Sequence, residues 1–306
     1  MNKSIVKMAL VIGAVIIVGL GMLLLMNSKP EIKKAVKPSE KSIVQIEEKT
    51  SQAKQQEVGS KEDNVVATIV SKEGQEIKAL IVKLGDDDIY VSQEAAGKLA
   101  LLGKKAVPIL VNSLPENNLF LKGQITFLLG RIGDKEAVPE LIKLTNDENA
   151  YIRRNAVEAL GKIKDESTIS VIERGLFDDD STVRQRSAGA LGQLQDSRVA
   201  GSLLNRLSDE TEREVKFAVV EALGKSKNSL ATPALLKELK SDAEGLAYNN
   251  DVVFALGEIG DKSALPGLNE HLKELKQFQS TDELVIFEFK QAIQATEDAI
   301  KKIQMN

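Results

Sequence analysis

The sequence predicts an all-α protein, an α-solenoid of about six to seven stacked helical hairpins, and three observations lead to this prediction. Only 4% of the residues are aromatic and none is Trp, while 42% are hydrophobic, which suits small helices packed through Ala, Leu, Ile and Val. Apolar residues recur with helical spacing. Intervals of 30, 31, 31, 32 and 33 residues separate a set of small residues: Ala100, Gly130, Gly161, Gly192, Gly224 and Gly257.

Each repeat has the layout of a helical hairpin. An apolar segment such as "VPELIKL" is followed by a polar turn, "TNDENA", and by a second segment, "IRRNAVEALGKI". Pro139 and Pro266 suit the first turn of a helix, while Asp147 or Asn149, and Asp180 or Ser181, are candidate N-caps. The recurring Gly either ends the second helix or lets neighbouring helices approach closely.

The repeats resemble a known family. The stretches "DDDSTVRQRSAGALGQLQD" and "NDENAYIRRNAVEALGKIKD" are similar to HEAT repeats of the short class named after phycobilisome lyase subunits, over about residues 76–266. The resemblance is weaker at Tyr248 and Asn249, where Val and Arg are expected, and from about residue 262 a longer helical pair with polar outer positions suits a terminal cap. The resemblance implies stacked hairpins in residues 64–306 and a surface that binds proteins.

The N-terminus predicts a membrane anchor. After a basic head, residues 1–7, the uncharged stretch 8–26 would form a helix about 28 Å long, close to the hydrocarbon thickness of a bilayer. A cleaved signal peptide is the alternative, but the apolar run is long and no small-x-small site follows it. Residues 27–63 have the composition of a flexible linker.

The orientation of this anchor is open. The signal-anchor layout favours a single-pass protein of the inner membrane with an extracytoplasmic body, whereas the lysines that follow the apolar run favour a cytoplasmic one. The absence of Cys excludes a lipidated Cys and disulfides.

The sequence contains no clear catalytic or metal-binding motif. The chain has a single histidine, His271, which we expect to lie on the surface and not to bind a metal. Deoxyhypusine hydroxylases resemble this fold and hold iron through several His-Glu pairs, so their activity does not carry over. The acidic runs 86–88 and 178–180 are expected to cap helices. We therefore predict no catalytic residue, no cofactor and no metal site.

The charge of the body argues against nucleic acid as a partner. Residues 64–306 hold 31 Lys and Arg against 38 Asp and Glu, a net charge of −7. Arg153, Arg184 and Lys216 occupy one repeat position, and a ladder of ion pairs with acidic residues of the neighbouring repeat explains them.

A protein partner is expected on one face of the second helices. The positions seven and three residues before each small residue lie one turn apart on the less apolar side. Phenylalanines among polar residues there are typical of binding anchors, unless the fold buries them. The sequence thus predicts a membrane-tethered, non-catalytic scaffold, with an enzyme or its auxiliary subunit as the alternative. The candidate partner-binding residues are Phe127, Arg154, Glu158, Gln185, Phe217, Glu221 and Phe254.

Overall fold

The chain forms an all-helical array of paired helices. The computed structural model describes residues 71–115, 117–239 and 246–305, all within one compact unit, residues 40–306. The described part contains seven helical pairs and no strand. The first helices of the pairs are α4 (Lys72–Leu84), α6 (Val107–Asn112), α8 (Val138–Leu144), α10 (Ile169–Gly175), α12 (Ala200–Asp209), α14 (Thr232–Glu238) and α16 (Leu265–Gln277). The second helices are α5 (Ile89–Leu102), α7 (Leu119–Ile132), α9 (Ala150–Ile163), α11 (Ser181–Leu194), α13 (Arg213–Ser226), α15 (Leu246–Ile259) and α17 (Glu283–Met305).

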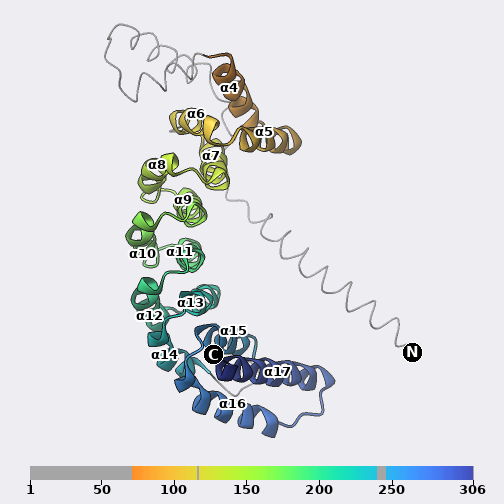
Figure 1. Cartoon of the computed structure of the whole chain (residues 1–306). Coiled ribbons are helices and arrows are strands. Elements are labelled where there is room, and N and C mark those ends of the chain that lie inside the picture. Colours follow the sequence, from red (N-terminus) through yellow and green to blue (C-terminus); the bar gives the residue numbers. More distant parts are fainter. Residues whose placement is uncertain (1–70, 116, 240–245, 306) are drawn as a thin grey trace, which may run out of the picture. The chain divides into compact units, whose positions relative to one another are not determined.

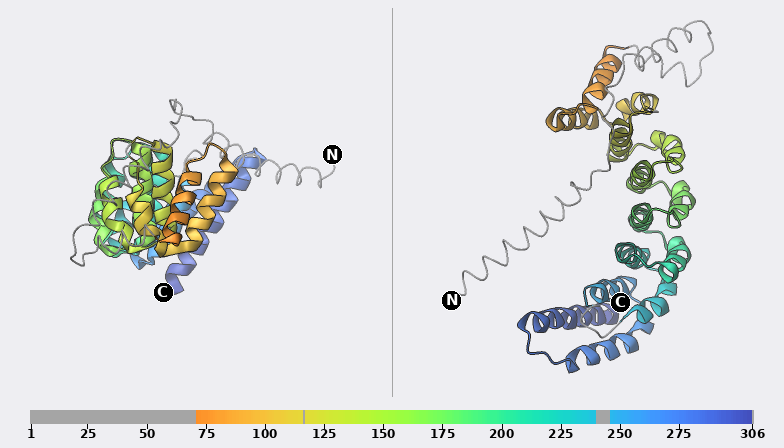
Figure 2. Two further views of the ribbon diagram at one scale, coloured as in Figure 1. Left: turned by 90° about the horizontal axis from the view of Figure 1, so that it is seen from above. Right: turned by 180° about the vertical axis from the view of Figure 1, so that it is seen from behind.

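The pairs stack so that their helices lie in two layers. Helices α8, α10, α12 and α14 form one row, and α7, α9, α11 and α13 form the other, as the views from opposite sides agree (Figures 1 and 2). Each second helix contacts the next, from α7 through to α17. The residue before each repeat glycine is a leucine with no exposed surface, and these leucines help to form the core between the layers: Leu129, Leu160, Leu191, Leu223 and Leu256.

The repeat glycines are sites of close helix packing and not helix caps. A Cβ added to Gly161 would lie 2.6 Å from the Cβ and 2.8 Å from the Cα of Ala190, a residue of the next second helix. Gly130 and Gly224 make the same approach to the next helix, with added-Cβ distances of 2.7 and 2.8 Å to the facing Ala Cα. The second helices end two or three residues further on, where the chain turns left-handed.

Helix caps lie where the turn chemistry places them. Asn149 accepts from the amide of Tyr151, and Asp180 accepts from the amides of Thr182 and Val183. These bonds satisfy free amides at the starts of α9 and α11, whereas α8, α10 and α13 begin without a side-chain cap. Proline occupies the first turn of α8 and α16, as the sequence predicts.

Two expectations from the sequence need correction. His271 is buried, because it shares one face of α16 with Leu268 and Leu275, and that face packs into the fold. The outer positions of the last pair are also not uniformly polar, since Leu284 and Phe287 are exposed on the first turns of α17.

The N-terminal segments cannot be compared with the structure. The head, the apolar stretch and the linker, residues 1–63, all lie outside the described residues. Within the described ranges, no helix is both long enough and apolar enough to cross a membrane.

Two glycines of the second helices should respond oppositely to alanine. Gly161→Ala inserts a methyl group against the backbone of α11, so we expect a loss of about 1–3 kcal/mol in unfolding free energy. Gly189→Ala has no atom within 4 Å of the new methyl group, so the higher helix propensity of Ala should stabilise the fold by up to about 1 kcal/mol. Chemical denaturation measures both changes, and equal effects would contradict the packing role of Gly161.

Candidate functional site

The candidate site is the free face of the second helices, by which we mean the side of α7, α9, α11, α13 and α15 turned away from the row of first helices. All seven residues predicted from the sequence lie on these helices, and none of them is buried. They are spread over five helices, so the structure brings only neighbouring members together.

The three phenylalanines differ in their surroundings. Phe127 is 41% exposed with the ammonium group of Lys162 4.7 Å from its ring centre, and Phe254 is 64% exposed with Lys302 at 5.9 Å. Phe217 is only partly exposed, because its ring packs edge-on against Tyr248 with 5.4 Å between ring centres. Phe127 and Phe254 are thus available to a partner, whereas Phe217 contributes to packing between α13 and α15.

The structure adds an aromatic residue that the sequence did not single out. Tyr151 of α9 lies over Gly123 of α7, where an added Cβ would stand only 2.2 Å from the Tyr151 ring. The guanidinium of Arg154 lies 5.0 Å from the centre of the same ring, and Tyr151 is still 38% exposed. Its position, ten residues before Gly161, is one turn from Arg154, so extending the helical spacing by three residues could have found it.

The charge of the free face reverses along the array. We compare the positions ten, seven, six and three residues before each repeat glycine and one residue after it. On α7, α9 and α11 these positions carry four cations and one carboxylate: Arg131, Arg154, Lys162, Arg186 and Glu158. The same positions of α13 and α15 carry four carboxylates and one cation: Glu214, Glu221, Asp251, Glu258 and Lys225.

The carboxylate of Asp251 belongs to this acidic group. Partial loss of hydration, and secondarily the negative charge of Glu221, raise the pKa of Asp251. No hydrogen bond or ion pair joins the carboxylate of Asp251 to another of the described residues. The acidic half of the free face therefore lacks a full set of internal counterions.

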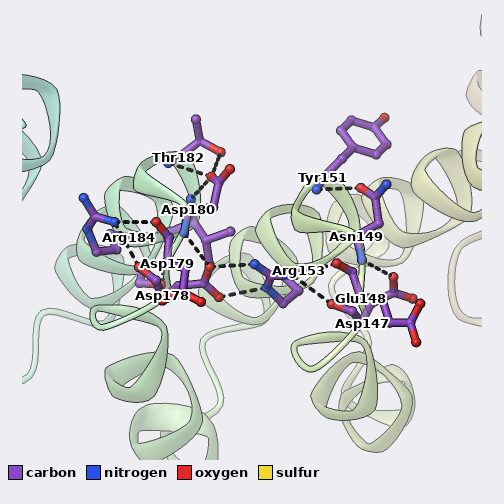
Figure 3. Close-up of polar contacts among 12 residues, drawn as sticks. Asp147, Glu148, Asn149, Tyr151, Arg153, Asp178, Asp179, Asp180, Thr182 and Arg184 are labelled. Atoms are coloured by element: carbon purple, nitrogen blue, oxygen red, sulfur yellow. Dashed lines mark hydrogen bonds and ion pairs between the residues drawn. The ribbon is translucent and has the colours of Figure 1, made fainter. Parts of the chain in front are cut away.

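A ladder of ion pairs occupies the edge of the array beside the turns (Figure 3). Arg153 donates to the carboxylate of Asp178 at 2.8 and 2.7 Å, and to the carbonyl oxygens of Asp147 and Glu148 in its own turn at 3.0 Å each. Arg184 repeats the pattern one pair later: it donates to the carbonyl oxygens of Asp178 and Asp179 in its own turn (Figure 3). It also donates to the carboxylate of Glu210 at 2.9 and 3.2 Å.

This ladder confirms the structural interpretation of the repeated basic residues. Lys122 bonds Asp147 at 2.9 Å, and Lys216 lies 3.7 Å from Glu238, so the same link recurs at both ends of the series. Because these cations are paired within the protein, they are committed to holding successive turns together.

Glu210 is the most strongly perturbed acid of the ladder. Burial alone would raise its pKa, but hydrogen bonds from Arg184 and from the amides of Glu212 and Thr211 outweigh that effect and lower the pKa to about 2. The acidic run 178–180 also has structural roles, since Asp178 pairs with Arg153 and Asp180 caps α11.

The described residues offer no arrangement of metal ligands. Among them, no three His, Cys, Asp or Glu side chains come together in a way that could hold a metal ion. Burial lowers the pKa of His271, and its Nε2 has no hydrogen-bond partner in the described part of the chain.

Comparisons with known proteins agree with the architecture. By fold the protein is a helical solenoid of the HEAT and armadillo kind, and a solved structure of Kap95p with RanGDP matches it with a TM-score of 0.55 at 15% identity, covering 84% of this chain and 38% of that one. The model for HEAT repeats matches residues 120–191 and 174–248, and the model for the PBS lyase HEAT-like repeat matches residues 251–274. The chain therefore contains HEAT repeats of both descriptions.

Two enzymes are also among the similar proteins. A deoxyhypusine hydroxylase of Candida albicans is 35% identical over 81 residues, which are 26% of this chain and 25% of that protein. The CpcE and CpcF complex of phycocyanin lyase from Nostoc sp. PCC7120 has a TM-score of 0.45 and 21% identity, covering 48% of this chain and 98% of that one. The chain thus spans about a quarter of the curated relative that it matches.

The ladder should make stability depend on pH. The folded-state pKa of Glu210, about 2, lies below its ordinary value of 4.5, so its stabilising effect is complete above pH 4.5 and is lost as the pH falls toward 2. Glu210→Gln should cost about 1–3 kcal/mol of unfolding free energy at pH 7. The difference from the unmodified chain should shrink with acidification. Urea denaturation across this pH range tests it, and a constant difference would contradict the linkage.

Alanine substitution should separate the three phenylalanines. Phe254→Ala should change the unfolding free energy by no more than about 0.5 kcal/mol, as at other surface sites. Phe217→Ala should cost more than about 1 kcal/mol, because it removes the edge-on contact with Tyr248 and leaves a gap between α13 and α15. Phe127→Ala should behave like Phe254→Ala. Losses well above about 1 kcal/mol at all three positions in denaturation experiments would show that all three rings belong to the core.

Proposed function

We propose that the protein is a membrane-tethered, non-catalytic scaffold that binds a protein partner on the free face of its second helices. The observation that carries this proposal is the exposure of Phe127, Tyr151 and Phe254 on a face where, apart from Phe120 and Phe217, the other residues are polar or small. Exposed aromatic rings flanked by polar groups are typical of the anchors of protein interfaces. Helical-repeat arrays commonly use one extended face for this purpose.

The internal pairing of other polar groups supports this choice of surface. The cations beside the turns are held in the ladder, and the acidic turn residues serve as caps. On the free face, by contrast, Arg154 lies against the ring of Tyr151, and neither its guanidinium nor the carboxylate of Asp251 forms an ion pair within the described residues. Groups that the fold does not use internally are the ones that a partner can engage.

The membrane tether is the second part of the proposal and rests on the sequence. The uncharged stretch 8–26 serves as the anchor, and residues 27–63 connect it to the array. The body lies outside the cytoplasm in this scheme, which follows the signal-anchor layout of a short basic head before an apolar run.

Crosslinking in intact cells tests the function. A photocrosslinking amino acid at Phe127 or Phe254 should capture one defined protein, while the same group at exposed Leu230, near the start of α14, should not. The captured complex should remain in the membrane fraction after alkaline extraction, because the anchor is integral. Release of the chain by alkali would contradict the tether. If no protein is crosslinked and the chain instead converts a small molecule, the result would favour an enzyme or its auxiliary subunit.

A further inference from the structure

We propose that the basic half of the free face, formed by α7 and α9, docks an acidic segment of the partner through an aromatic–arginine patch. The patch consists of Phe120, Phe127, Tyr151, Arg131 and Arg154. The inference rests on the proposed function, since it names the chemistry of the segment that the scaffold binds.

Tyr151 is held ready for contact before any partner arrives. Its ring lies across Gly123, where even a methyl group would come within 2.2 Å of Cε1 and 2.8 Å of the hydroxyl oxygen. The ring is therefore placed by the backbone of the neighbouring helix, and Arg154 lies against it at 5.0 Å. An aromatic side chain fixed in this way loses little conformational entropy on binding.

The positive charges of the two arginines of the patch are not neutralised by an ion pair within the described residues. No ion pair joins Arg131 or Arg154 to another of the described residues, whereas Lys162 and Arg186 share the carboxylate of Glu158 at 2.7 and 3.7 Å. A guanidinium group forms two parallel hydrogen bonds with a carboxylate, and it keeps its affinity when stacked on an aromatic ring. Carboxylate side chains next to apolar ones are the chemistry that this patch fits.

The reversal of charge along the free face limits the length of an acidic ligand. Beyond α11, the equivalent positions of α13 and α15 carry four carboxylates and a single cation. A long polyanion such as a nucleic acid would therefore meet repulsion once it extended to α13 and α15. A short acidic segment within a protein stays over the basic half, where the one carboxylate, Glu158, is already paired with Lys162 and Arg186, so the geometry favours a peptide over a nucleic acid.

The test uses the full chain in detergent and a fluorescent peptide in which Glu alternates with Leu and Ser. Fluorescence anisotropy should show binding of this peptide, but not of matched peptides with Gln or Lys in place of Glu. Arg154→Gln and Tyr151→Ala should each weaken binding at least about tenfold, and Arg154→Lys should restore only part of it. Glu158→Gln should strengthen binding, because it removes the one carboxylate of the basic half.

Two glycine variants provide a matched comparison. Gly123→Ala should weaken binding like Tyr151→Ala, although it removes no contacting side chain, because it displaces the Tyr151 ring. Gly189→Ala, on the same layer with open space around it, should leave binding unchanged. If Gly123→Ala prevents folding, as circular dichroism would reveal, the exposed variants Arg154→Gln and Tyr151→Ala still decide the question.

Several outcomes would overturn the inference. These are no binding of the Glu peptide, binding that Arg154→Gln leaves unchanged, tighter binding of a single-stranded oligonucleotide, or self-association of the chain that Arg154→Gln abolishes. If the crosslinked partner is captured equally by the Arg154→Gln variant, the scaffold stands and only the acidic-segment assignment fails. If the Glu peptide binds but no protein is crosslinked in cells, the scaffold function fails instead.

Discussion

The close approach of consecutive second helices is the constraint on which the rest of the structure depends. Glycine at the repeat position removes the side chain that would separate the helices, so that the backbone of one helix meets an alanine of the next. The buried leucine beside each glycine then reaches the core between the two layers. Because one hairpin cannot cover its own apolar flanks, each pair depends on its neighbours, and this dependence explains why the sequence repeats.

Polar groups of the fold divide into two sets with different roles. Beside the turns, Arg153 and Arg184 each bond to their own turn and to a carboxylate of the next one, so their charges are paired within the protein. On the free face, the contacts between helices differ from repeat to repeat, such as Tyr151 on Gly123 and Phe217 against Tyr248. The first set makes the array uniform, and the second makes each part of its surface distinct.

Much of the fold could be predicted from the sequence because it depends on local, repeated signals. The spacing of the glycines, the Asn149 and Asp180 caps and the basic ladder are all confirmed, since each reflects chemistry within one repeat or between adjacent ones. The site was less predictable. The sequence could not show that Phe217 packs against Tyr248, that Tyr151 lies on Gly123, or that His271 is buried, because these depend on how side chains from separate helices meet. The role of the seven candidate residues in binding stays a prediction.

Two glycines illustrate how such an array can evolve. Gly161 is fixed by its contact with the backbone of α11, so mutations there are removed by selection for folding. Gly189 lies in the middle of α11, next to the Ala190 that Gly161 contacts, and has no neighbour within 4 Å, so its replacement leaves the contact between helices intact. Within α11, Ala190 is therefore constrained by the packing of the helices, whereas the adjacent Gly189 is not. A lineage can exchange one partner for another through the exposed positions while the positions that stack the helices remain constant, which allows one architecture to serve unrelated ligands.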